Sequence, residues 1–220
     1  MNKQHRVEKR VIEEAIAFVR DLFRNDFSGH DLSHTLRVYR TATQIALAEG
    51  ADVSVVQLAA LLHDADDRKL SPDTCESKDR AVGFMKKYGI DEKTIQDIIK
   101  IIEDVSVKGT DSKKPDTIEG ACVQDADRLD AIGAIGIARA FAYGGNHHRI
   151  MYDPDIPPEK DMNGERYFAS RSTTLNHFYE KLFLLKDMMN TETAKGMAEK
   201  RDQFMRAYVD EFLLEWNGAS

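Results

Sequence analysis

Helical periodicity runs through almost the whole chain, and the alternation that is typical of β-strands is nearly absent. Within residues 5–24, for example, Val11, Ala15 and Val19 recur on one face of a helix. The expected helices span residues 5–24, 32–49, 51–63, 74–89 and 91–105, followed by one or two helices over 116–143 and further helix over 170–216. The sequence therefore predicts an all-α fold.

Two polar stretches, residues 107–116 and 144–165, interrupt the helical pattern. We find no repeat, low-complexity tract or linker that would divide the chain into independent domains. A chain of 220 residues can bury the core of one large domain. We therefore expect a single domain over residues 1–220, with a C-terminal helical extension at about 165–216.

The net charge of −7 is spread along the chain, which argues against binding of long nucleic acid, because that needs a basic stripe. A small anionic substrate stays compatible, since a bound divalent ion can reverse the local charge. No apolar run approaches the roughly 20 residues that span a bilayer, and the first residues resemble an amphipathic helix rather than a signal peptide. Cys75 and Cys122 fall in no metal-binding pattern, so we expect reduced thiols and a cytoplasmic protein.

Two histidines occupy positions where the helical pattern calls for apolar residues. His34 shares a face with Val38 and Ala42, and His63 ends the apolar run LAALLH and is followed at once by Asp64. A lone histidine on an apolar face is more often a satisfied core residue, and the dipeptide alone is common by chance. Their joint occurrence in buried helices favours a functional site.

Three carboxylates, Asp125, Asp127 and Asp130, lie in a segment whose apolar neighbours, such as Val123 and Ile135, predict burial. Isolated carboxylates are costly in a dry core, and three of them would also repel one another. A helix cap would explain one of them, whereas a bound cation would relieve the whole set.

Two imidazoles and two carboxylates suit one divalent ion such as Mn, Fe or Co, or more weakly Mg. Neighbouring residues on a regular helix point about 100° apart, so His63 and Asp64 can share an ion only near the end of a helix. The polar run DADDRKLSPD supplies that ending. Four protein ligands would leave two octahedral positions for water and substrate.

The motifs HDLSHTLRV, LAALLHDADD and DADRLDA, in this order, resemble those of the HD-domain superfamily of metal-dependent phosphohydrolases. The resemblance spans about residues 28–140, and the C-terminal helices look similar to those of a small bacterial subgroup. It implies an HD-type helical bundle with additional C-terminal helices. The metal ligands that it implies are His34, His63, Asp64 and Asp127. The ADRL context selects Asp127 over Asp125 and Asp130, which remain candidates for supporting or substrate contacts.

The resemblance also implies a carboxylate that orients or deprotonates the attacking water. Asp67, four residues after His63, stands where guanosine-tetraphosphate hydrolases of the superfamily carry an acidic residue in this role. Those enzymes have a second acidic residue next, where this chain has Arg68. Because Arg68 replaces this second acidic residue, both Asp66 and Asp67 stay candidates for the water-orienting carboxylate.

A phosphorylated substrate needs hydrogen-bond donors and positive charge. Any single lysine or arginine is more often a solvated surface residue. Helical phase and the family resemblance favour Arg37 and Lys78. The candidate substrate contacts are His30, Arg37, Lys69, Lys78, Arg128, Arg149, His177 and Lys181.

These features lead us to expect a phosphohydrolase that converts (deoxy)nucleoside triphosphates into monophosphates and pyrophosphate. A nucleoside-monophosphate phosphatase and a cyclic-nucleotide phosphodiesterase are the enzymatic alternatives. A nucleotide-sensing module is the non-enzymatic one, and a dinuclear-iron oxygenase on the same scaffold ranks last. Apolar stripes on the terminal helices suggest a homodimer, while the aromatic stripe ending at Trp216 is expected to lie in the core.

Overall fold

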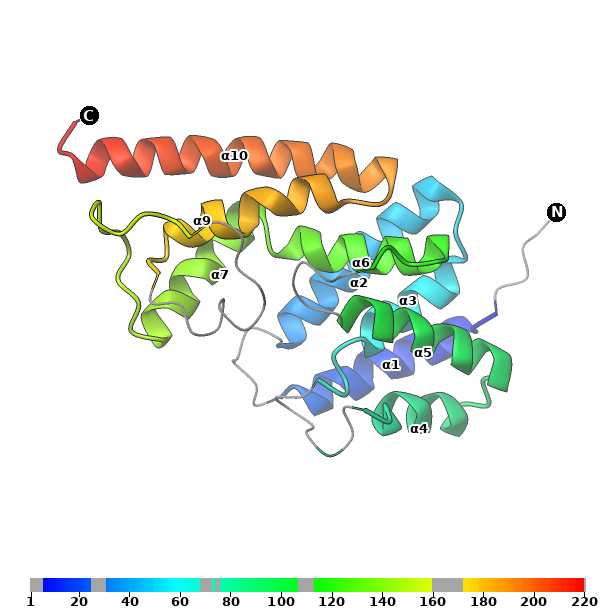
Figure 1. Cartoon of the computed structure of the whole chain (residues 1–220). Helices are drawn as coiled ribbons and strands as arrows, with labels where there is room; N and C mark the ends of the chain where they lie inside the picture. The colour runs from blue at the N-terminus through cyan, green and yellow to red at the C-terminus, as the bar shows by residue number, and fades with distance from the viewer. Residues whose placement is uncertain are drawn as a thin grey trace. The chain divides into compact units, whose positions relative to one another are not determined.

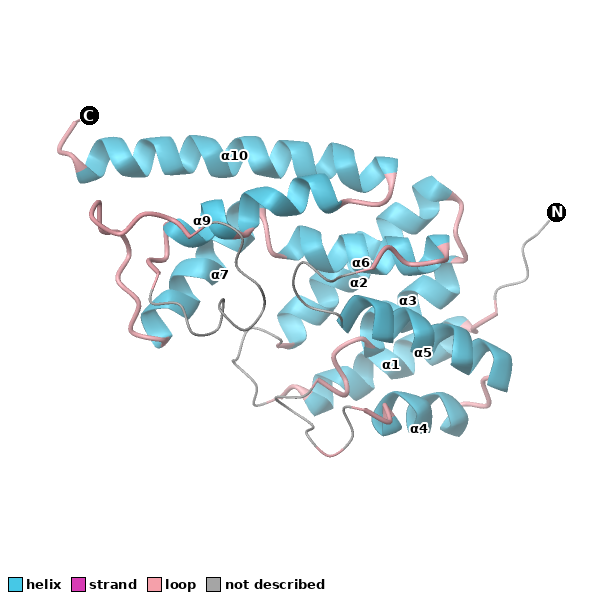
Figure 2. Ribbon diagram, in the orientation of Figure 1, coloured by secondary structure: helices cyan, strands magenta, loops and turns pink. Residues whose placement is uncertain are grey.

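The computed structural model describes residues 6–24, 31–67, 73, 76–106, 113–159 and 172–219. Within these ranges every regular element is a helix, which confirms the all-α prediction (Figure 2). The chain forms two compact units, residues 1–127 and 128–220, which we call unit 1 and unit 2. The single-domain organisation stays a prediction.

Unit 1 is organised around the apolar helix α3, which contacts α1, α2 and α5. Leu58, Leu61 and Leu62 of α3 are completely buried, as an all-round apolar pattern predicts. The helices of this unit are α1 (Lys9–Leu22), α2 (Leu32–Glu49), α3 (Val53–Leu62), α4 (Asp79–Lys87), α5 (Glu92–Ser106) and the larger part of α6 (Ile118–Asp130) (Figure 1).

Local signals set the boundary between α2 and α3. Gly50 ends α2 in the left-handed conformation, with φ +70°, which glycine adopts without a steric penalty. The Asp52 side chain then accepts hydrogen bonds from the backbone N–H groups of Ser54 and Val55 and begins α3. Both signals were predictable from the sequence. By contrast, α4 begins at Asp79 and not near 74, since Lys78 has φ +55°, outside the helical region.

Unit 2 contains α7 (Gly133–Asn146), α9 (Asn176–Glu180), the 3₁₀ helix η1 (Leu182–Met188) and α10 (Glu192–Trp216). An aromatic cluster joins them: the ring of Phe141 on α7 lies 6.0–6.1 Å from those of Phe178, Tyr208 and Phe212. Helix α7 runs through the diglycine that the sequence assigned to a loop. A Cβ on Gly144 would lie 2.2 Å from Thr174 Oγ1, so any larger residue there would require Thr174 or the backbone to shift.

Some expected core positions are wrong. Ile135, Phe204 and Trp216 are 46%, 53% and 48% exposed, respectively. The buried face of α10 consists of Ala194, Ala198, Asp202, Met205 and Val209, whereas Tyr208 and Phe212 of the aromatic stripe are half-buried. Helical spacing identifies a stripe but does not say how much of it a neighbouring helix covers.

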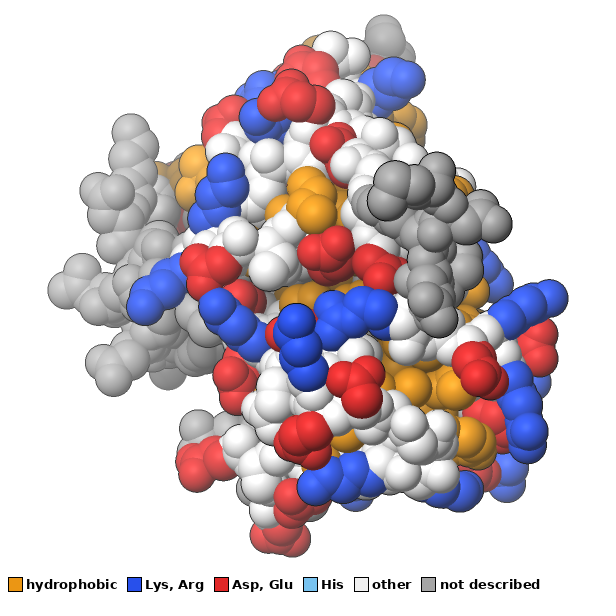
Figure 3. Space-filling view, turned by 90° about the vertical axis from the view of Figure 1, so that its right-hand side faces the viewer, with side chains coloured by type: hydrophobic (Ala, Val, Ile, Leu, Met, Phe, Trp, Pro, Cys, Tyr) orange, Lys and Arg blue, Asp and Glu red, His pale blue; other side chains and the backbone are white. Residues whose placement is uncertain are grey.

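Cys122 is buried and forms no disulfide, and burial raises the pKa of its thiol to about 12. Cys75 lies outside the described residues. None of the helices in the described ranges combines the length and apolarity needed to cross a membrane. On the face shown in Figure 3, acidic and basic side chains are interspersed, in keeping with the dispersed charge of the sequence.

Candidate metal centre

His34 lies in the first turn of α2 and is 1% exposed. The side chain of Asp31 caps this helix by accepting a hydrogen bond from the His34 backbone N–H at 2.8 Å. The cap fixes the first turn, and the fully buried Val38 and Ala42 hold the same face of α2 against the core. The imidazole therefore points inward, as the sequence pattern predicts.

His63 and Asp64 follow the last residue of α3. The Ala65 N–H bonds to the Leu62 carbonyl, and the Asp67 N–H bonds to the Asp64 carbonyl, at 3.0 and 3.1 Å. These bonds form a turn in place of a further helical turn. Two adjacent side chains thereby meet, with His63 Nε2 3.2 Å from Asp64 Oδ2.

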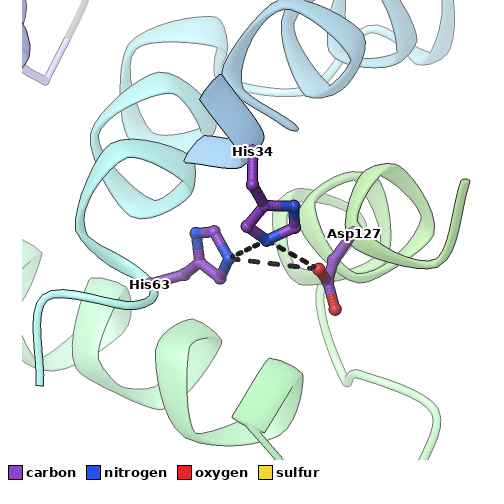
Figure 4. Close-up of side chains that lie close together, drawn as sticks. All are labelled: His34, His63 and Asp127. Atoms are coloured by element: carbon purple, nitrogen blue, oxygen red, sulfur yellow. Dashed lines mark hydrogen bonds and ion pairs between the residues drawn. The ribbon is translucent and has the colours of Figure 1, made fainter. Parts of the chain in front are cut away.

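Asp127 reaches the same place from α6, as Figure 4 shows. Its Oδ1 lies 3.4 Å from His34 Nε2 and 4.0 Å from His63 Nε2. Its side chain is 35% exposed, more than that of either histidine. Asp125 is completely buried, and Asp130 forms an ion pair with Arg139 in unit 2 at 2.5 Å.

The separations of the donor atoms fit a single ion. The Nε2 atoms of His34 and His63 are 3.3 Å apart, and Asp64 Oδ2 lies 3.4 Å from the His34 nitrogen. Ligands about 2.1 Å from one ion lie about 3.0 Å apart in adjacent octahedral positions and about 3.4 Å apart in a tetrahedron. His34, His63 and Asp127 thus form a group that could hold a metal ion. Asp64 Oδ2 lies close to both histidine nitrogens but is not part of that group, so its role as a ligand stays a prediction.

The hydrogen bond on the far side of the His63 ring determines what its Nε2 can do. Nδ1 lies 2.8 Å from the Ala60 carbonyl, to which it can only donate. A neutral His63 therefore carries its lone pair on Nε2, facing the Asp64 carboxylate and the His34 ring. Electron pairs that converge in a buried site repel one another unless a cation lies between them. The donor set therefore fits a borderline divalent ion.

The pKa shifts of His63 and Asp127 likewise indicate that positive charge is stabilised at this centre. Burial, the largest influence, lowers the pKa of His63, but the carboxylates of Asp64 and Asp127 outweigh it and raise the pKa above its ordinary value. Burial raises the pKa of Asp127, but His34 and His63 outweigh it and lower the pKa. A proton held at the centre would have to leave before a metal ion binds.

The two candidate water-orienting residues differ in their surroundings. Asp67 is half-buried in the turn that carries Asp64. Asp66 is 2% exposed and accepts hydrogen bonds from the backbone N–H groups of Arg80 and Ala81. The sequence pattern missed this contact, because Asp66 and its partners are 14 and 15 residues apart. The contact favours Asp67 as the catalytic candidate.

In unit 1, two of the predicted substrate contacts are half-buried: Arg37 on α2, within one turn of His34, and Lys78 just before α4. His30 and Lys69 lie outside the described residues.

The other predicted substrate contacts belong to unit 2. Arg128 donates a hydrogen bond to the Met188 carbonyl, which gives it a structural partner. Arg149 and Lys181 are charged neighbours of His177: burial first, and then these two charges, lower the pKa of His177 to about 3. The guanidinium of Arg149 also lies 5.6 Å from the centre of the Tyr143 ring.

The fold is all-helical, and histidines and aspartates from three helical segments lie close together in it. These two features place the chain in the class of helical proteins with a candidate metal centre. The family model that matches the chain is the HD domain, over residues 31–132, which include His34, His63, Asp64 and Asp127. The chain belongs to the HD-domain family and is an HD-superfamily hydrolase.

Similar proteins match nearly the full length. The Bacillus subtilis protein YpgQ is 38% identical over 92% of this chain and 92% of its own. The crystal structure of an HD-superfamily hydrolase from Bacillus thuringiensis has a TM-score of 0.77 and 39% identity, covering 96% of this chain and 99% of the other. YpgQ in complex with ADP has a TM-score of 0.71 and 36% identity, over 92% and 93% of the two chains.

Proposed function

We propose that this protein is a metal-dependent phosphohydrolase that converts (deoxy)nucleoside triphosphates into monophosphates and pyrophosphate. The convergence of His34, His63, Asp64 and Asp127, with donor atoms 3.2–4.0 Å apart in the pairs described above, carries the proposal. The crystal structure of YpgQ with ADP supports a nucleotide as the substrate.

His34, His63, Asp64 and Asp127 would hold one divalent ion, with Mn, Co, Fe and Mg as candidates for its identity. When bound, such an ion lowers the pKa of a coordinated water and polarises the phosphoryl group. The Ala60 carbonyl keeps the His63 ring oriented, as a hydrogen bond on the far nitrogen does in many metal sites.

Asp67 would accept the proton of the attacking water. The water oxygen forms a bond to the α-phosphorus, the bond from that phosphorus to the bridging oxygen breaks, and pyrophosphate leaves. Arg37 and Lys78 of unit 1 would balance the negative charge of the phosphates. Contacts from Arg128, Arg149, His177 and Lys181 of unit 2, and from His30 and Lys69, stay predictions.

The test is a panel of nucleotides and phosphate esters, each assayed with Mn, Co, Mg or EDTA. Phosphate is measured with and without added pyrophosphatase. Triphosphate cleavage to pyrophosphate yields orthophosphate only after pyrophosphatase is added. Direct release of orthophosphate would contradict this reaction, and release from monophosphates would favour the phosphatase.

Two further alternatives are tested by the same panel. Cleavage of a 3′,5′-cyclic nucleotide would favour a phosphodiesterase. Nucleotide binding without turnover in any metal would favour a sensing module. The group formed by His34, His63 and Asp127, which could hold a metal ion, with Asp64 next to both histidines, supports the enzyme over the sensor.

A further inference from the structure

Asp66 is a buried carboxylate whose two oxygens both accept hydrogen bonds from the first turn of α4. Oδ1 accepts from the Arg80 N–H at 3.2 Å, and Oδ2 accepts from the Ala81 N–H at 3.0 Å. With 2% exposure, its charge is shielded from solvent. These N–H groups belong to the first helical turn, where backbone donors have no intrahelical partner.

The residue in the capping position of α4 does not itself accept hydrogen bonds from these N–H groups. Lys78 stands there with no side-chain hydrogen bond to the helix, and its φ of +55° lies in the left-handed region. A lysine adopts this strained conformation only where the surroundings enforce it. Asp66 supplies such enforcement, because it fixes the backbone two and three residues after Lys78.

Asp66 also belongs to the turn that forms the candidate centre. It lies between Asp64, a proposed metal ligand, and Asp67, the proposed water-orienting residue. The Asp67 N–H bonds to the Asp64 carbonyl across it. One short turn therefore carries the proposed metal ligand Asp64 and the proposed water-orienting residue Asp67. Through Asp66, the same turn also fixes the start of α4.

We propose that Asp66 is a positioning residue, which holds Lys78 where its ammonium group binds a substrate phosphate, and that it takes no part in proton transfer. The inference rests on the proposed function, in which Lys78 contacts the phosphates. The half-buried position of Lys78 supports it, because partial burial leaves its side chain fewer conformations to lose when substrate binds.

Asp66→Asn keeps the size of the side chain but places an amide donor against one of the two N–H groups. We expect KM to rise about three- to tenfold, the range that loss of one hydrogen bond gives, while kcat changes less than about threefold. A general base would show the opposite pattern. A fall in kcat of about 100-fold or more at unchanged KM would overturn the inference.

A double-mutant cycle tests whether Asp66 acts through Lys78. Lys78→Met removes the charge and keeps most of the stem. In that background, Asp66→Asn should change KM by less than about twofold. An equal rise in KM in both backgrounds would show that Asp66 acts independently of Lys78, against the inference.

Lys78→Gly separates binding from folding. Glycine relieves the left-handed strain, so we expect a higher Tm together with weaker binding of ADP, measured by calorimetry. His148→Gly is the matched control, since His148 has φ +54° and is exposed in unit 2. It should raise Tm and leave ADP binding unchanged. A Lys78→Gly variant with wild-type ADP affinity would contradict the inference.

These measurements remain decisive if the wild-type protein hydrolyses no nucleotide. In that case the proposed reaction fails, while ADP affinity and amide exchange still judge the role of Asp66. Exchange at the Arg80 and Ala81 N–H groups should accelerate in Asp66→Asn and stay unchanged in Lys78→Met. Unchanged exchange in Asp66→Asn would overturn the capping contact itself.

Discussion

At the scale of single residues, the orientation of the two histidines depends on hydrogen bonds made on the side away from the candidate metal centre. The Ala60 carbonyl fixes the proton of His63 on Nδ1, and Asp31 fixes the turn that presents His34. These contacts are local, at three residues along the chain in each case. They pre-orient both rings, so less ordering remains to be done when an ion binds.

His63 and Asp127 are two of the proposed metal ligands. His63→Ala and Asp127→Ala should each reduce turnover by more than about 100-fold, because each removes a proposed direct metal ligand. Loss of a residue that only hydrogen-bonds to a ligand already costs about 10- to 100-fold in metal affinity or activity. The circular dichroism of both variants should remain helical. His148→Ala, at an exposed position, should retain wild-type turnover. Near wild-type rates in either ligand variant would refute the assigned coordination.

At the scale of secondary-structure elements, close packing decides where α7 tolerates a side chain. Gly144 and Gly145 are neighbours in this helix, but only Gly144 faces Thr174. A Cβ on Gly145 meets nothing within 4 Å. The pair therefore separates helix propensity from packing at adjacent positions.

Gly144→Ala should lower the free energy of unfolding by about 1–3 kcal/mol, since the new methyl group forces the backbone or Thr174 to move. Gly145→Ala should raise it by up to about 1 kcal/mol, because alanine is the better helix former. Urea unfolding at one pH measures both. Equal effects in the two variants would show that the contact with Thr174 is not restrictive.

At the scale of the whole molecule, helix α6 contributes residues to both compact units, since unit 1 ends at Asp127 and the helix ends at Asp130. Many large apolar side chains that are exposed among the described residues belong to unit 2. They include Ile150, Met151, Leu184, Phe204, Leu214 and Trp216. The homodimer stays a prediction, which sedimentation equilibrium of the full chain tests.

Binding of an ion should stabilise the fold, because the donors converge only in the native state. Manganese at 100 times its dissociation constant should add about 2.7 kcal/mol to the free energy of unfolding, and EDTA should reverse the gain. Asp127→Asn should lose most of this response. Thermal unfolding at several manganese concentrations measures it, and a Tm that is independent of manganese would count against the centre.

Acid should destabilise the fold through His177. Its pKa is about 3 in the folded protein, mainly because of burial, and about 6.5 in an unfolded chain. The unfolded state therefore binds more protons between these values, so the contribution to stability is complete above pH 6.5 and falls as the pH drops towards 3. The slope is at most about 1.4 kcal/mol per pH unit.

His177→Gln provides the control, because glutamine is polar but does not titrate in this range. Urea unfolding of both proteins between pH 7.5 and 4.5 should show that the free energy of unfolding of the wild type falls relative to that of His177→Gln as the pH drops. A constant difference over this range would show that His177 titrates normally in the folded state.

The order and type of the proposed ligands could be predicted because histidines and aspartates interrupt apolar helical faces. Helix boundaries at Gly50 and Asp52 followed from local capping signals. The sequence left open whether Asp66 or Asp67 orients or deprotonates the attacking water. The bond from Asp66 to α4 now favours Asp67, because a carboxylate with both oxygens engaged by N–H groups is poorly placed to accept a proton from water.

The sequence by itself determined the helices and their apolar faces, because periodicity and caps depend on residues a few positions apart. Only the tertiary structure decided what covers each face: Ile135 and Trp216 are about half exposed although their spacing predicts burial. It also decided that His34 and His63, 29 residues apart, meet at 3.3 Å. Such contacts depend on the packing of whole helices, which no local pattern specifies.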